Sequence, residues 1–162
     1  MGDTPISESR SVSTLRFGRV NRTMLLVHNE RNPSAPDWSA WVEAYAQGAL
    51  EFGVRALVVV SGGGGPNARQ RTELMSTLIG RLERASAEEF RTAVCSDSVL
   101  ARTITKAIGW LSGTPHLRSF GFGQRMEALE FLRVPEPERS EILRALSHFE
   151  GELRLRRANA RR

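Results

Sequence analysis

The sequence predicts an α/β fold, with helices packed on a mixed, mostly parallel sheet of about five strands and an extra helix at the C-terminus. Short apolar segments typical of strands alternate with longer segments whose apolar residues recur at helical spacing. The clearest strand is "RALVVV", Arg55–Val60, whose uninterrupted apolar run is typical of a parallel strand covered on both faces. The chain has 162 residues, 40% hydrophobic and 25% charged, which fits a single globular domain.

Two strands and a helix are expected before the clearest strand. Extended segments are expected at Ser13–Phe17 and Thr23–His28, joined by a turn over Gly18–Asn21. A helix then begins near Pro36, a residue suited to a first helical turn, and stops at Gly53. Its apolar residues share one face and are expected to form core rather than a ligand site: Trp38, Trp41, Val42, Tyr45, Ala49 and Phe52.

Strands and helices continue to alternate in the second half of the chain. Asn67 is a natural N-cap for the helix that follows the clearest strand. Later segments are expected as a strand at Arg91–Ser96, a helix at Val99–Gly113, a strand at His116–Phe122, and helices at Gly123–Leu132 and Pro135–Leu153. The buried positions expected on these helices include Leu74, Met75, Leu78, Ile79, Leu82, Met126, Leu129, Leu132, Ile142, Leu146, Phe149 and Leu153.

The predicted domain organisation is a single α/β domain over residues 13–153, in which 134–153 form the added C-terminal helix. Residues 1–12 are polar and expected to be disordered, and residues 154–162 form a basic tail. The net charge is +5, and the last twelve residues, "GELRLRRANARR", carry four of those net charges. We expect this tail to be a solvated terminus, so binding to nucleic acid is not expected.

Composition also argues against several other classes of protein. No apolar run reaches about 18 residues, so no membrane span is expected. The start, "MGDTPISESRSVS", has no apolar signal-peptide core, so a cytoplasmic location is expected. Cys95 is the only cysteine and is expected to be a small buried hydrophobe, which excludes an internal disulfide. The three histidines are scattered along the chain, so neither a metal site nor a cofactor is expected.

The loop "SGGGGPN", Ser61–Asn67, lies between a strand and a helix, where phosphate-binding sites are often built. Arg69 and Arg71 in the first helical turn oppose the helix dipole, and a bound anion or a partner's carboxylate would remove that penalty. No lysine follows the glycines as in a P-loop, and the dinucleotide fingerprint does not fit either. Two interpretations stay open: a turn that contacts a protein, and an anion or nucleotide site.

Catalytic patterns are weak. Ser61 ends a predicted strand, but "VVSGG" is not the Gly-x-Ser-x-Gly nucleophile elbow. His28 and Asp97 also lie at strand ends, so a hydrolase built from these three residues is a minor alternative. Asp97 and Ser98 bring polar groups to the same sheet edge, although helix capping explains them adequately.

Three segments carry a resemblance to a known family: "APDWSAW", "GGGGPNARQR" and "AVCSDSVLARTITKAIGWL". Over roughly Ser13 to Val134 the sequence resembles bacterial STAS-like proteins, a group named for sulfate transporters and anti-sigma factor antagonists. The resemblance implies a STAS-like fold that uses the edge around the glycine loop to dock a protein.

The sequence departs from the family at its regulatory position. In anti-sigma factor antagonists, a kinase phosphorylates a Ser or Thr at the start of the helix after the central strand. Here that place holds Gly64, Gly65, Pro66 and Asn67, so the phosphorylation switch is not carried over to this chain.

Our prediction is therefore a non-enzymatic regulatory or protein-interaction module. The alternatives are a sensor that binds a nucleotide or phosphate at Gly62–Asn67 and, more weakly, a small hydrolase. We expect a protein partner, with a homodimer and a phosphate-containing ligand left open. The candidate partner- or anion-binding residues are Ser61, Gly62, Gly63, Gly64, Gly65, Asn67, Arg69, Arg71, Asp97 and Ser98.

Overall fold

The structure is a computed structural model, and it describes residues 13–82, 90–99 and 116–153. In chain order the elements are β1 (Leu15–Val20), β2 (Thr23–His28), α1 (Ala35–Glu51), β3 (Ala56–Ser61), α2 (Ala68–Leu82), β4 (Arg91–Cys95), β5 (Leu117–Phe120), α4 (Arg125–Phe131) and α5 (Glu136–Glu152). The predicted disordered segment, the basic tail and nearly all of the helix expected at Val99–Gly113 lie outside the described residues.

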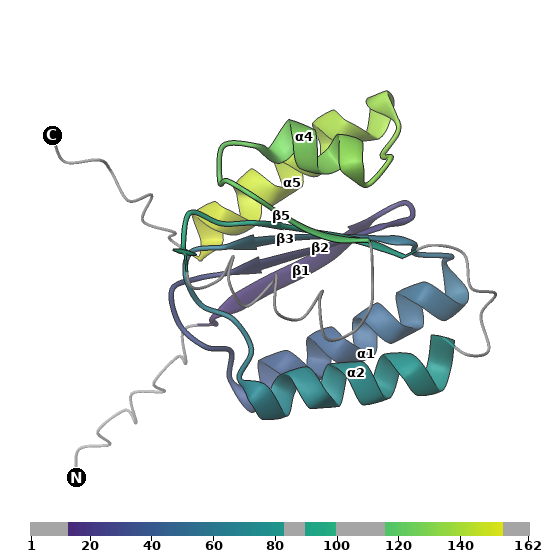
Figure 1. The fold of residues 1–162 in the computed structure, drawn as a ribbon, viewed down its shortest axis with the longest axis vertical. Helices are drawn as coiled ribbons and strands as arrows, with labels where there is room; N and C mark the ends of the chain where they lie inside the picture. Colours follow the sequence, from purple (N-terminus) through teal and green to yellow (C-terminus); the bar gives the residue numbers. More distant parts are fainter. Residues whose placement is uncertain (1–12, 83–89, 100–115, 154–162) are drawn as a thin grey trace, which may run out of the picture.

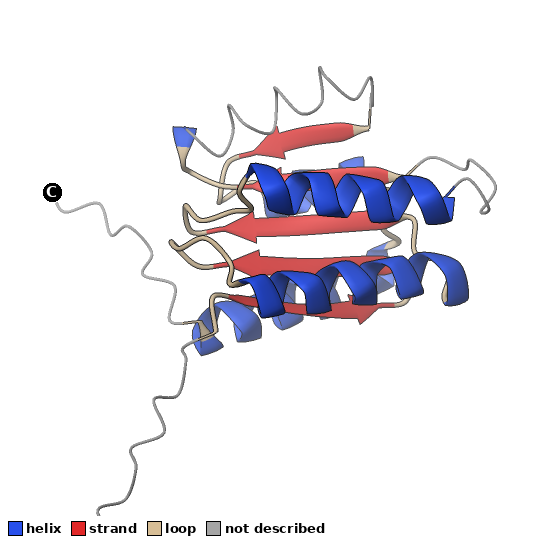
Figure 2. Cartoon of the chain, turned by 90° about the horizontal axis from the view of Figure 1, so that it is seen from below, coloured by secondary structure: helices blue, strands red, loops and turns tan. Residues whose placement is uncertain are grey.

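The five strands form one sheet in the order β1-β2-β3-β4-β5. β1 pairs with β2 in the antiparallel direction, and the other neighbours are parallel. Figure 1 shows α4 and α5 on one face of the sheet and α1 and α2 on the other. Figure 2 shows α1 and α2 lying along the strands, as crossover helices do in parallel sheets. The predicted α/β fold with its mixed, mostly parallel sheet is therefore confirmed.

The aromatic stripe of α1 forms the core on its side of the sheet. Trp38, Trp41 and Tyr45 are buried against alternate residues of β2, such as Met24 and Leu26. Alternation of this kind is expected because successive strand side chains point to opposite faces. The prediction that this stripe is core is thus confirmed for these aromatic residues.

The other face of the sheet is covered by α4 and α5. Ile142 and Leu146 are fully buried, in one cluster with Leu25 and Val27 of β2. Phe149 lies so close to β1 that a Cβ atom added at Gly18 would be 2.9 Å from the end of its ring. The apolar face of α5 is therefore used within the chain, to cover the sheet.

Close packing at Gly18 also explains why the predicted turn was misplaced. The sequence suggested a turn over Gly18–Asn21, but β1 continues to Val20 and the hairpin turns at Asn21 and Arg22. Asn21 has a φ of 48°, the left-handed conformation that asparagine tolerates in tight hairpin turns. Gly18 provides room for an aromatic ring and does not make the turn.

Three residues predicted on buried faces are exposed. Phe52 is 50% exposed because α1 ends one residue before it, and the Arg19 guanidinium lies 4.0 Å from its ring centroid. Met75 of α2 is 38% exposed, because the preceding residue, Leu74, is the one that packs on the core. Met126 lies in the first turn of α4, whose buried residues are Ala128 and Leu129. The side chains of Leu78, Ile79 and Leu82 are outside the described part of the chain.

Candidate functional site

Parallel strands bring the predicted site residues to one edge of the sheet. His28 of β2 lies opposite Ser61 of β3, and Cys95 of β4 lies opposite Val60 of β3. The loops that follow these strands therefore emerge side by side, as the carboxyl ends of parallel strands must. We call this set of loops, residues 29–34, 62–67 and 96–98, together with the first turn of α2, the carboxyl edge.

The glycine loop is held by hydrogen bonds within the chain. Ser61 Oγ donates to the Gly64 carbonyl oxygen at 2.5 Å and accepts from the Gly63 N–H at 3.1 Å. The Gly62 N–H donates to the His28 carbonyl at 3.0 Å, and the Gly64 N–H donates to the Asn29 carbonyl at 2.9 Å. Three successive amides of the loop are thus already satisfied, which leaves little of its backbone to bind an anion.

Gly64 is where the loop approaches the neighbouring segment most closely. A Cβ atom at this position would lie 2.1 Å from the Arg31 carbonyl oxygen and 2.6 Å from that of Asn29. Gly63 has a φ of +124°, a conformation that residues with side chains rarely adopt. Glycine is therefore required at position 64 by the lack of space and at position 63 by the backbone conformation. The glycines of this loop are not interchangeable.

The first turn of α2 is fixed by a reciprocal cap. Asn67 Oδ1 accepts from the Gln70 N–H at 2.9 Å, and the Asn67 N–H donates to Gln70 Oε1 at 3.0 Å. The predicted N-cap at Asn67 is therefore confirmed, in the form of a capping box.

Gln70 also joins α2 to two other parts of the fold. It is buried, and its Nε2 donates to the Pro33 carbonyl at 2.9 Å. Its own carbonyl accepts from Trp38 Nε1 of α1 at 3.0 Å. Sequence reasoning missed Gln70, although the Asn-x-x-Gln spacing before an apolar stripe was a readable capping signal.

The two arginines after the glycine loop have different environments. Arg71 is half-buried, and its Nη1 donates to the Pro66 carbonyl at 2.9 Å. Arg69 is exposed, and its guanidinium makes no hydrogen bond or ion pair with the described residues. Of the two predicted cations, Arg69 is therefore the one available at the carboxyl edge.

The segment Ser96–Ser98 forms the far end of the carboxyl edge. Ser96 is buried and its Oγ accepts from the Ser98 N–H at 3.1 Å. Asp97 is exposed, and its Oδ1 accepts from the Phe122 N–H at 2.9 Å. Asp97 thus links the loop after β4 to the loop after β5, which stiffens this end of the edge.

The structure does not assemble Ser61, His28 and Asp97 into a catalytic triad. Ser61 is buried and its hydroxyl is occupied by its own loop, whereas Asp97 accepts from Phe122. His28 is 2% exposed, and its ring stacks on Trp38 with centroids 6.2 Å apart. Burial lowers the pKa of His28 to about 4, and no described residue hydrogen-bonds to its Nδ1. The hydrolase alternative lacks its predicted geometry, because Asp97 is bonded elsewhere and no described residue accepts from His28 Nδ1 to orient the ring toward the serine.

Other predicted features can be checked in the described part of the chain. Cys95 is fully buried and burial raises its thiol pKa to about 11, as expected for a structural cysteine. No three His, Cys, Asp or Glu side chains among the described residues form a group that could hold a metal ion. None of the helices in the described ranges is long and apolar enough to cross a membrane.

Comparison with known proteins supports the fold. No protein-family model and no curated protein matches the sequence. A solved structure from Shewanella loihica PV-4, described as an uncharacterized protein from the DUF3478 family with a SpoIIAA-like fold, is similar over 76% of this chain and 98% of its own, with 13% identity and a TM-score of 0.51. The chain therefore has a SpoIIAA-like, STAS-like fold, and the predicted resemblance is confirmed at that level.

Proposed function

We propose that the chain is a non-enzymatic regulatory module that binds a protein partner through the carboxyl edge. The SpoIIAA-like fold supports this proposal, since the resemblance of the sequence implied docking at this edge. The observation that carries the proposal is the packing of the glycine loop. The N–H groups of Gly62, Gly63 and Gly64 are hydrogen-bonded within the chain, and Gly64 lies against the backbone of the loop after β2.

A loop of this kind suits protein recognition better than small-ligand recognition. Its backbone is fixed before binding, so little conformational entropy is lost when a partner docks. Gly62, Gly63 and Asn67 are exposed on it, so a partner can approach the backbone closely. The same hydrogen bonds that fix the loop occupy the donors that a phosphate would need, which disfavours the sensor alternative.

The proposed partner presents a carboxylate to Arg69. This cation lies in the first turn of α2, where the helix dipole already favours negative charge. The guanidinium is exposed and has no carboxylate partner among the described residues. A carboxylate from another protein would pair with it and add to the favourable dipole interaction.

Phosphorylation at the usual STAS position is not part of the proposed mechanism. Ser61 is 4% exposed and its hydroxyl is bonded to the loop. Thr72 is exposed but one turn further into α2, where its Oγ1 donates to the Ala68 carbonyl at 3.0 Å. We therefore expect the partner to recognise this edge without prior modification of the loop.

The test is a charge reversal at Arg69. Arg69→Glu places an acid in the first turn of α2, which the helix dipole favours, so the variant is expected to fold at least as stably as the native protein. Arg144→Glu is the matched control, since Arg144 is exposed on α5 and outside the carboxyl edge. Tagged native protein and both variants would be used to capture partners, which mass spectrometry would identify and titration would then measure directly.

We expect a partner that binds the native protein and the Arg144→Glu control but binds Arg69→Glu at least tenfold more weakly. A partner whose affinity is the same for all three proteins would contradict docking at this edge. A photo-crosslinking side chain placed at the exposed Ala68 position gives a second readout, because it leaves the Asn67 cap intact and must label the partner if the carboxyl edge is the interface.

A further inference from the structure

A pocket in the described part of the chain lies at the opposite edge of the sheet, where the parallel strands begin. Its volume is about 640 Å³, within the range of roughly 300–1,000 Å³ typical of small-molecule sites. It is lined by Arg22, Thr23, Arg55, Ala56, Arg91, Leu132, Arg133, Val134, Pro135 and Glu138. We call it the arginine pocket.

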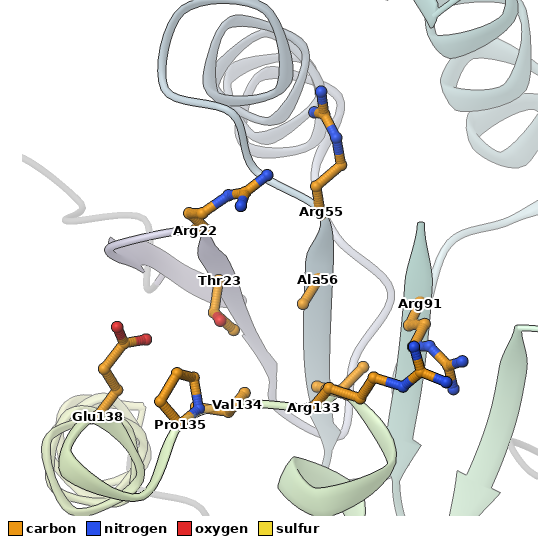
Figure 3. Close-up of a pocket in the computed structure, with 10 residues that line it drawn as sticks. Arg22, Thr23, Arg55, Ala56, Arg91, Arg133, Val134, Pro135 and Glu138 are labelled. Carbon is orange, nitrogen blue, oxygen red and sulfur yellow. The ribbon is translucent and has the colours of Figure 1, made fainter. Parts of the chain in front are cut away.

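Four arginines and one glutamate line this pocket. Figure 3 shows Arg22, Arg55 and Arg91 at the starts of β2, β3 and β4, and Arg133 extending from the α4–α5 connection toward Arg91. Glu138, on α5, is the single carboxylate among the described residues that line the pocket. Positive charges gathered around one cavity repel each other, and an anion in the cavity would offset that repulsion.

Hydrogen bonds to backbone carbonyls hold three of these arginines near the pocket. Arg22 Nε donates to Gly53 at 3.0 Å, Arg55 Nη1 to Val54 at 2.9 Å, and Arg91 Nη1 to Phe131 at 3.2 Å. A guanidinium has five N–H donors, so one such bond positions the side chain without using all of them.

Arg55 has a donor that is both buried and unused. Its Nε has no hydrogen-bond partner among the described residues, and water does not reach it. A buried donor without an acceptor on a charged group is costly, so native structures rarely leave one unsatisfied. The Arg55 side chain would have to shift for an anion oxygen in the arginine pocket to accept from this N–H, and that shift would replace an unsatisfied donor with a charge-assisted hydrogen bond.

The remaining walls of the pocket are apolar. Leu132, Val134 and Ala56 are buried side chains, and Pro135 adds an apolar ring beside them. An organic group attached to the anion would contact these apolar atoms and cover the exposed Pro135 ring, which a bare inorganic ion would leave in water.

From this arrangement we infer that the arginine pocket binds a small organic phosphate, with its phosphate groups on the arginines and its organic part against Leu132, Val134 and Pro135. Arginine suits this class because its planar fork matches phosphate oxygens in a bidentate manner. The four arginines line one concavity and not an extended stripe, which favours a small molecule over the extended backbone of a nucleic acid. The site is independent of the carboxyl edge, at the other end of the same strands.

The test measures binding of pyrophosphate and of ADP to the full chain by calorimetry and thermal denaturation, at low ionic strength and without divalent metal. Pyrophosphate supplies only the anion, and ADP adds an organic group of a size that the pocket can hold. Saturating ADP is expected to raise the melting temperature by about 5 °C or more, and ADP should bind more tightly than pyrophosphate.

Four variants distinguish a specific site from general attraction to a basic protein. Arg55→Gln and Arg22→Gln should each weaken ADP binding about tenfold or more, because each removes charge-assisted hydrogen bonds. Glu138→Gln should strengthen it, because it removes the one carboxylate among the described lining residues. Arg144→Gln removes one exposed charge outside the pocket and should leave binding unchanged.

Several results would overturn the inference. One is the absence of any melting-temperature shift with either probe at millimolar concentration, and another is equal weakening by Arg22→Gln and Arg144→Gln. Affinity for single-stranded or duplex oligonucleotides that exceeds the affinity for ADP and grows with length would assign the arginines to nucleic acid instead. If Arg55→Gln is less stable than the native protein, Glu138→Gln still decides, since it changes a side chain on the surface of α5.

Discussion

Replacing Gly64 by alanine tests whether the glycine loop is packed as described. The added Cβ would start 2.1 Å from the Arg31 carbonyl oxygen, and real Cβ contacts are essentially never shorter than 3.0 Å. The two backbone segments must therefore separate by about 0.9 Å. Overpacking of this kind costs about 1–3 kcal/mol, and the separation also strains the hydrogen bond from the Gly64 N–H to Asn29, worth about 1 kcal/mol. We expect Gly64→Ala to lower the free energy of unfolding by about 2–4 kcal/mol.

Two neighbouring glycines provide the matched controls. At Gly65 an added Cβ meets nothing within 4 Å, so Gly65→Ala should change stability by no more than about 0.5 kcal/mol. At Gly63 the space is also open, but the φ of +124° strains any side chain, so Gly63→Ala should cost about 1–2 kcal/mol. Urea denaturation of the three variants measures this order directly. Equal stabilities for Gly64→Ala and Gly65→Ala would refute the packing described between the two loops.

Two further predictions concern the core beside this edge. Gln70→Ala removes the acceptor for the Asn67 N–H and the donor for the buried Pro33 carbonyl, so urea denaturation should show a loss of about 2 kcal/mol, against about 0.5 kcal/mol or less for exposed Gln47→Ala. His28, whose pKa falls to about 4 on burial, stays neutral in the folded protein between pH 4 and 6.5 while the unfolded chain binds a proton, so stability should rise with pH through that window by roughly 3 kcal/mol. His28→Leu should flatten that part of the stability curve, and an unchanged pH dependence in this variant would assign the effect to other groups.

Much of the fold could be predicted because its signals are local. "ALVVV" indicates a covered strand by itself, and Trp38, Trp41 and Tyr45 mark the buried face of α1 by spacing alone. The same spacing misassigned Phe52, because periodicity does not say at which residue a helix stops contacting the sheet. Asn67 was recognised as a cap for the same local reason.

The candidate site was only partly predictable, because its decisive contacts join distant segments. The sequence placed Gly64 in a loop, but nothing local indicates that the carbonyl of Arg31 lies against it. Consecutive glycines therefore suggested free amides for an anion, whereas the fold supplies acceptors for them from the loop after β2. In the same way, Arg22, Arg55 and Arg91 lie far apart in the sequence, and only the parallel register brings them around one pocket.

The order of the sheet has a consequence for self-association. Among the described strands, β1 and β5 are the two outer ones, and their outward-facing backbone groups are where a second copy would add its own strand. Both carry an exposed arginine side chain, Arg19 on β1 and Arg118 on β5, and like charges brought together at such a seam repel each other. A continuous sheet running through two copies is therefore disfavoured at either border, and a homodimer of this chain would have to form through helices or loops.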